Sequence, residues 1–175
     1  MSHGNVNLVH LIDSVAKTHR LVVRSSYSAE IIAAAHGIED AFPTIITLIE
    51  LKQGPLSATQ LKHFNDVGRI PMQTTLTIDA ESVYKSLTSL DLKTPAEKTL
   101  LGHVMWIREL LQKSILKHVQ WCDTRDMTAD GHTKGSIDRK VLLDLMKGHQ
   151  QYKHPVKKHA PHRPQEQEQA QRTLR

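Results

Sequence analysis

The stretch Trp121-Cys-Asp-Thr-Arg-Asp-Met-Thr-Ala-Asp-Gly-His-Thr-Lys-Gly135 follows an apolar run, residues 115–121, whose alternation predicts a short strand. Directly after this run the chain carries three aspartates, Asp123, Asp126 and Asp130. A strand that delivers carboxylates into a loop is a common way to build a metal-binding or phosphate-processing site. A solvated turn and helix cap is the alternative interpretation, because Asp, Thr and Gly also favour those structures.

The composition predicts one domain of ordinary size and a tail. The chain has 175 residues, of which 39% are apolar and 4% aromatic, so the core must be built from Leu, Ile, Val and Ala. The one cysteine, Cys122, excludes a disulfide framework and a Cys-rich zinc module, and it indicates an intracellular location, cytoplasmic or nuclear. No run approaches the roughly 20 uninterrupted apolar residues of a membrane helix, so no membrane partner is expected.

The positive charge is concentrated near the C-terminus. Residues 150–175 carry six basic and two acidic side chains, so of the net charge of +5 only about +1 is left for the rest of the chain. The body is therefore not a strongly basic nucleic-acid platform. The tail is rich in His, Lys, Pro and Gln, which predicts disorder, with its cations either solvated or in contact with phosphates. We therefore expect a domain at residues 1–148 and a disordered tail at residues 149–175.

The apolar periodicity predicts a mixed sheet with helices packed on it, in the α/β class. An antiparallel hairpin is expected first, followed by a long helix that Ser28 caps and that Pro43 kinks or divides. A later strand ends at Asp79 and leads into a helix. The expected strands are 6–12, 20–25, 74–78 and 115–121, and the expected helices are 29–51, 57–62, 83–87, 94–112 and 136–146.

Three acids share a position relative to the expected strands. Glu30 lies in the first turn of the long helix, Asp79 lies at the end of a strand, and Asp130 follows another strand. Each has a structural explanation, as a residue that caps a helix or complements its dipole. Carboxylates that meet at one edge of a sheet are also what a two-metal phosphoryl-transfer site needs, since Mg²⁺ prefers oxygen ligands. The residues alone leave both interpretations open.

Three segments, in the same order along the chain, resemble the ribonuclease H domain of copia-type LTR retrotransposon Pol polyproteins. Arg24-Ser-Ser-Tyr-Ser-Ala-Glu30, before an Ala-rich helix, resembles the Ser-rich Ala-Glu segment of that family. Thr77-Ile-Asp79-Ala-Glu-Ser-Val-Tyr84 resembles the family's strand that ends in Asp and is followed by a helix. Ala129-Asp130-Gly-His-Thr133-Lys134, after Trp121, is similar to the signature Trp-Val-Pro-Thr…Ala-Asp-x-Leu-Thr-Lys.

The resemblance implies a ribonuclease H-like mixed sheet of five strands with flanking helices. It implies hydrolysis of the RNA strand of an RNA–DNA hybrid with two Mg²⁺ ions, Mn²⁺ being the alternative ion. By position, Glu30, Asp79 and Asp130 would be three of the usual four metal-binding acids. Asp123 and Asp126 do not match the signature, and we interpret them as turn and cap residues. Hybrids are recognised mainly through shape, phosphates and the 2′-hydroxyl, so little sequence preference is expected.

The chain also departs from the family pattern. The family's first acid sits on a first strand upstream of the hairpin, and this chain begins too late to contain it. His132 replaces the Leu of the signature, and Cys122-Asp123 replaces its Val-Pro. We therefore expect an N-terminally truncated, degenerate domain that is weak or inactive alone, because a two-metal site with one acid missing binds ions more weakly. A non-catalytic module that binds nucleic acid, and a fragment without activity, are the alternatives.

Overall fold

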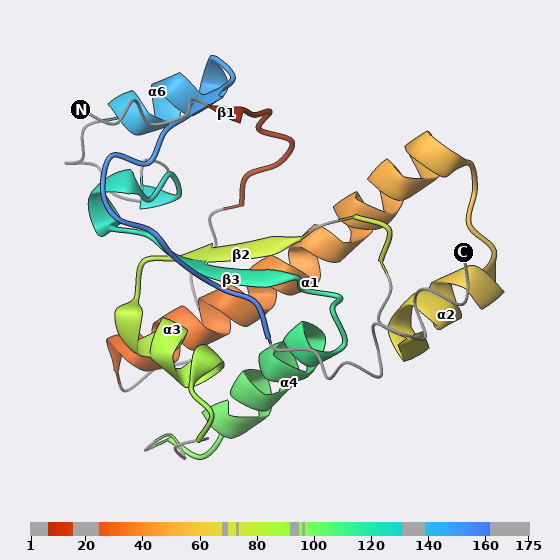
Figure 1. Ribbon diagram of the computed structural model, residues 1–175, viewed down its shortest axis with the longest axis horizontal. Coiled ribbons are helices and arrows are strands. Elements are labelled where there is room, and N and C mark those ends of the chain that lie inside the picture. The colour runs from red at the N-terminus through yellow and green to blue at the C-terminus, as the bar shows by residue number, and fades with distance from the viewer. Residues whose placement is uncertain are drawn as a thin grey trace.

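The computed structural model describes residues 7–15, 25–67, 70–72, 74–91, 95, 97–130 and 139–161 (Figure 1). Its fold is of the α+β type, with helices and a small mixed sheet, which agrees in general with the predicted α/β class. The helices are α1 (Ser26–Gln53), α2 (Ala58–Val67), α3 (Glu81–Thr88), α4 (Leu100–Gln112), the 3-10 helix η1 (Thr124–Asp126) and α6 (Lys140–Met146).

Three strands form the main sheet, in the order β2-β3-β5. β2 (Thr75–Ile78) and β3 (His118–Trp121) are parallel, and β5 (Lys157–His159) pairs antiparallel with β3. α3 and α4 lie between β2 and β3 in the chain, because two parallel strands need a crossover connection. β1 (Asn7–Leu8) and β4 (His149–Gln150) form a separate antiparallel pair, which lies beside α6 in Figure 1.

The long helix α1 begins and continues differently from the prediction. The Ser25 hydroxyl caps it by accepting the Ser28 N–H at 3.1 Å, so the predicted cap at Ser28 is wrong. Ser28 is buried instead and donates through Oγ to Glu97 Oε2 at 2.8 Å. Pro43 lies inside one continuous helix, so the predicted alternative of two helices is wrong. Buried apolar residues lie on both sides of Pro43, Ile38 before it and Ile49 after it, and their packing offsets the single hydrogen bond that proline removes.

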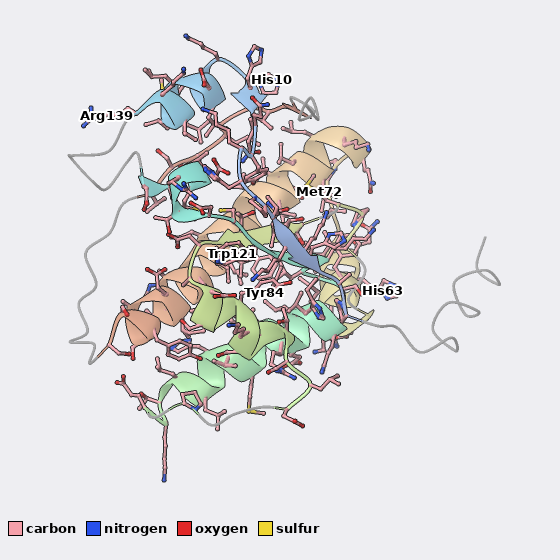
Figure 2. All side chains as sticks on the ribbon, turned by 60° about the vertical axis from the view of Figure 1, so that its left-hand side comes forward. His10, His63, Met72, Tyr84, Trp121 and Arg139 are labelled. Carbon is pink, nitrogen blue, oxygen red and sulfur yellow. The ribbon has the colours of Figure 1, made fainter. Side chains whose placement is uncertain are left out.

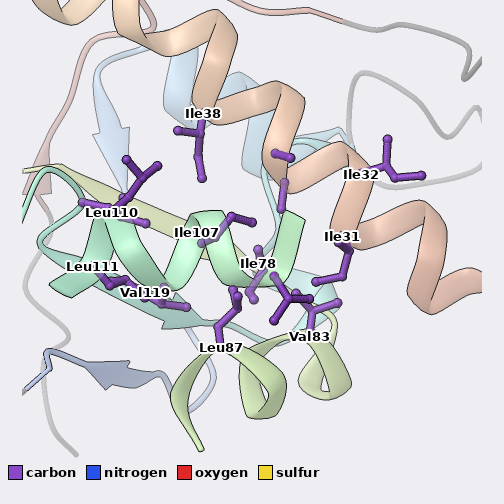
Figure 3. Close-up of a cluster of buried hydrophobic side chains, with 14 of the residues drawn as sticks. Ile31, Ile32, Ile38, Ile78, Val83, Leu87, Ile107, Leu110, Leu111 and Val119 are labelled. Carbon is purple, nitrogen blue, oxygen red and sulfur yellow. The ribbon is translucent and has the colours of Figure 1, made fainter. Parts of the chain in front are cut away.

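The core lies between the main sheet and the helices α1, α3 and α4 (Figure 3). Leu76, Ile78 and Val119 point to this side, and the strand alternation sends their neighbours to the other face. By length and mean hydropathy alone, α1 could also cross a membrane, a test that buried core helices pass as well. Fully buried side chains come from α1, α3, α4 and β3: Ile31, Val83, Val104, Ile107 and Val119.

The C-terminal segment differs from the predicted disordered tail. Residues 149–161 contain β4 and β5, whereas residues 162–175 lie outside the described part of the chain. β5 pairs Lys157 with Trp121 and His159 with Val119. Its sequence has no apolar alternation, so its order comes from pairing with backbone groups of β3 that would otherwise lie at a sheet edge.

The structure tests the predicted N-terminal hairpin only in part. Within the first expected strand, residues 6–12, Asn7–Leu8 is a strand that pairs with β4, and residues 9–12 are not in a strand. Of the second expected strand, residues 20–25, only Ser25 is described, and residues 131–138 before α6 also lie outside the described residues.

Candidate functional site

The carboxyl ends of β2 and β3 lie at the same edge of the main sheet, because the strands are parallel and Ile78 pairs with Trp121. Asp79 follows β2 directly, as predicted. The Trp121 indole Nε1 donates to the Asp79 carbonyl oxygen at 2.8 Å, and the Cys122 N–H donates to the Ile78 carbonyl oxygen at 3.0 Å. These bonds fix the backbone on both sides of this edge. We call it the acidic edge, defined by Asp79, Asp123, Asp126 and Asp130.

Asp123 is engaged by a neighbouring cation. It precedes η1 and accepts the Arg125 N–H at 3.0 Å as the helix cap. Its two carboxylate oxygens also accept from Arg125 Nε at 2.7 Å and from a terminal nitrogen of the same guanidinium at 2.8 Å. These hydrogen bonds hold the pKa of Asp123 well below its usual range. The interpretation of Asp123 as a cap residue is therefore confirmed.

Asp126 has a larger structural role than the predicted turn or cap. Its side chain is buried, and Oδ2 accepts the backbone N–H groups of Lys153 at 3.0 Å and His154 at 2.8 Å. The His154 Nδ1 lies 3.1 Å from the same oxygen, but its alignment is not that of a hydrogen bond. Asp126 thus attaches the segment that leads into β5. The two backbone donors lie 27 and 28 positions further along the chain, so no local sequence pattern could predict these hydrogen bonds.

The buried Cys122 thiol indicates where the carboxylates lie. Burial first, and four carboxylates after it, raise the pKa of Cys122 from 9.0 to about 11. Because a charge acts more strongly at short range, each of the four is close enough for its charge to act on this thiol. Asp130 is itself only 9% exposed. The four carboxylates, in decreasing order of effect, are Asp79, Asp126, Asp123 and Asp130. Two of the three predicted metal ligands, Asp79 and Asp130, are thus among them.

Glu30, the third predicted ligand, lies on the exposed side of α1 near its start and is not among those carboxylates. Within residues that the structure describes, no three His, Cys, Asp or Glu side chains are arranged to hold a metal ion. The carboxylate oxygens of Asp79 and Asp130 are donors of the kind that Mg²⁺ prefers. The oxygen atoms of these two side chains therefore suit Mg²⁺, but the structure does not bring all three predicted ligands together.

A cation from β5 also lies at the acidic edge, which the sequence reasoning missed. Lys157 Nζ lies 4.8 Å from the centre of the Trp121 ring, and 2.7 Å from Glu81 Oε1 in the first turn of α3. Figure 2 shows Trp121 close to α3, in agreement with this contact. Glu81 also pairs with Lys85 at 3.4 Å, and hydrogen bonding to Lys157 is the main cause that lowers its pKa. Because residues 149–175 were expected to be disordered, no contact of Lys157 with Trp121 or Glu81 was predicted.

Comparison of the chain with protein-family models, with curated proteins and with solved structures found no match.

Proposed function

We propose that this chain is a ribonuclease H-like module that acts on RNA–DNA hybrids and uses the acidic edge as the centre of a divalent-metal site. The observation that carries the proposal is that Asp79 directly follows β2, at the carboxyl ends of two parallel strands, and that its charge and that of Asp130 act on the same Cys122 thiol. Ligand sites in open sheets gather at this edge. The resemblance of the segments around Glu30, Asp79 and Asp130 supports the same assignment.

Asp79 and Asp130 would supply carboxylate oxygens to Mg²⁺ or Mn²⁺. A bound pair of ions would supply an activated water and stabilise the leaving oxygen of the cleaved phosphodiester. Trp121 would hold the Asp79 backbone in place through the indole hydrogen bond. Glu30 would have to approach from α1, or another acid would have to take its place, to complete the ligand set.

The outer edge of β2 offers a place for such an acid. The carbonyl oxygens of Thr74 and Ile78 accept hydrogen bonds from the β3 side, so the backbone groups of Thr75 and Thr77 point the other way. No backbone group in the described part of the chain pairs with them. An apolar cavity between β2 and α1, lined by Leu76 among others, runs beside this edge. A further strand paired here would bring its own carboxylate next to Asp79.

The test is a cleavage assay on a labelled RNA–DNA hybrid with Mg²⁺ and with Mn²⁺. We expect weak cleavage by the chain alone, stronger with Mn²⁺, and none by the Asp79→Asn variant. Asp91→Asn is the matched control, because Asp91 is an exposed acid after α3 and is not among the carboxylates that act on Cys122. Cleavage that survives Asp79→Asn would refute the assignment of Asp79.

A second candidate function is binding of nucleic acid without cleavage. The observation that favours it is the position of Lys157, which places a cation over the Trp121 ring and next to Glu81, where a phosphate could be held. Such binding would be indifferent to sequence and would weaken steeply with salt. Hybrid binding that persists in EDTA, with no product in either metal, would support this function over the first.

A further inference from the structure

The face of the main sheet opposite the core has a distinct composition. Because Leu76, Ile78 and Val119 pack into the core, the alternating positions of the same strands face away from it. The pairing of Gln120 with Lys158 extends this face onto β5. We call it the outer face, and its members are Thr75, Thr77, His118, Gln120 and Lys158.

Lysines lie on and beside the outer face. Lys158, a member of this face, is exposed, and Lys117, which directly precedes β3 and is not a member, is partly exposed. Burial, and then the charges of Lys158 and Lys117, lower the pKa of His118, and no carboxylate contributes to that shift. The His118 Nδ1 is buried and has no hydrogen-bond partner within the described residues. Two lysines therefore lie near an imidazole nitrogen that has no hydrogen-bond partner among the described residues, and no carboxylate offsets their effect on the pKa of His118.

An aromatic side chain completes this surface. Burial raises the pKa of Tyr152, which lies between β4 and β5, and the nearby Thr77 and Gln120 side chains of the outer face act against this shift. The Gln150 Nε2 donates to its hydroxyl at 3.0 Å. Cations beside an aromatic ring on a sheet surface are a common arrangement for contact with a nucleic-acid strand, where lysines meet phosphates and rings meet bases.

We propose that the outer face binds the phosphate backbone of a nucleic-acid strand through Lys117 and Lys158, with His118 beside them. The partner class rests on the proposed function, whereas the surface needs no metal and no part of the acidic edge. Thr75 and His118 lie at the opposite end of the strands from Asp79, about 13 Å away at 3.3 Å per residue. A strand of nucleic acid that lies along β2 and β3 would therefore contact both ends.

The experiment measures binding of a fluorescently labelled RNA–DNA hybrid to the full chain in EDTA, over a series of salt concentrations. Each phosphate contact contributes a slope of about 0.9 to the dependence of log affinity on log salt. We expect the Lys117→Gln/Lys158→Gln variant to bind more weakly at low salt, with a slope shallower by about 1.8 for two contacts. Lys52→Gln/Lys62→Gln removes the same charge from exposed positions of α1 and α2 and is the matched control.

A slope that is unchanged in the Lys117→Gln/Lys158→Gln variant, or equally reduced in the control, would overturn the proposal. A second readout is the NMR titration of His118, whose pKa should rise when hybrid phosphates neutralise the neighbouring lysines. Binding is measured in EDTA and cleavage with Mg²⁺ or Mn²⁺, so the two proposals are tested by separate experiments. A chain that cleaves no hybrid but has a salt slope that depends on Lys117 and Lys158 would refute the first proposal alone.

Discussion

The carboxylate of Asp126 accepts the backbone N–H of His154 at 2.8 Å, and the same oxygen accepts that of Lys153. Asp126 closes η1 directly after β3, whereas His154 lies three residues before β5. One buried carboxylate therefore joins the C-terminal segment to the acidic edge. β5, with only three residues, depends on this attachment as well as on its pairing with β3.

Replacement of Asp126 by Ala should release this segment. It leaves two backbone donors without their acceptor, and the free energy of unfolding should fall by about 3 kcal/mol. Urea unfolding measures the loss, and amide hydrogen exchange should speed up at residues 153–159 first. Asp123→Ala, in the same loop, should have a much smaller effect, because Asp123 is paired with an exposed arginine. Slow exchange in β5 of the Asp126→Ala variant would contradict this role.

A second prediction concerns the packing of α4. Ile107 is fully buried in the core, whereas Met105 on the same helix is 53% exposed. Ile107→Ala should lower the free energy of unfolding by about 3 kcal/mol, because it leaves a cavity between α1, α4 and the sheet. Met105→Ala should change it by less than about 0.5 kcal/mol. Equal effects of the two substitutions in urea unfolding would contradict the observed orientation of α4.

The apolar strand β2 could be predicted from the sequence, whereas the hydrogen bonds that hold β5 could not. The alternation around Leu76 and Ile78 predicted β2 and placed Asp79 at its end, because a half-buried strand has a period of two. β5 has no such pattern, since Lys157–His159 is held by backbone pairing and by Asp126. Long-range hydrogen bonds of this kind have no periodic signature in the sequence.

The candidate site shows the same limit. Asp79 lies at the edge that the strand order suggested, and its charge and that of Asp130 both act on the Cys122 thiol, whereas Glu30 is not among the carboxylates that do. The direction of a side chain on a helix depends on how the helix rolls against the sheet, which periodicity does not fix. Ser28 illustrates this point, because its burial against Glu97 follows from tertiary packing, and Ser25 takes the capping role instead.

A third prediction treats Trp121 as a positioning residue for Asp79. Trp121→Phe keeps an aromatic ring under Lys157 but removes the indole N–H that the Asp79 carbonyl accepts, at a cost of about 1 kcal/mol in stability. If the acidic edge binds Mn²⁺, the variant should need a higher Mn²⁺ concentration for half-maximal hybrid cleavage, with hybrid binding unchanged. Trp106→Phe on α4 is the control, because that side chain packs against the core away from the acidic edge. A Mn²⁺ dependence that is the same in both variants would show that Trp121 has no positioning role.

The last prediction concerns Cys122, whose thiol is fully buried with a pKa of about 11 against 9.0 for an unperturbed thiol. Between pH 9 and 11 the folded chain retains a proton that the unfolded chain loses, so the free energy of unfolding should fall as pH rises through this window. The contribution is fully present below pH 9, and its loss should be on the order of 2 kcal/mol. Urea unfolding of the unmodified chain and of Cys122→Ala at several pH values measures it. The difference between the two variants separates the effect of Cys122 from that of Tyr152, because burial also raises the pKa of Tyr152.

The folded protein should likewise react slowly with a thiol reagent at pH 8, because the thiolate is both rare and buried. Stability curves that run parallel from pH 8 to 11 would contradict the burial of Cys122 among four carboxylates.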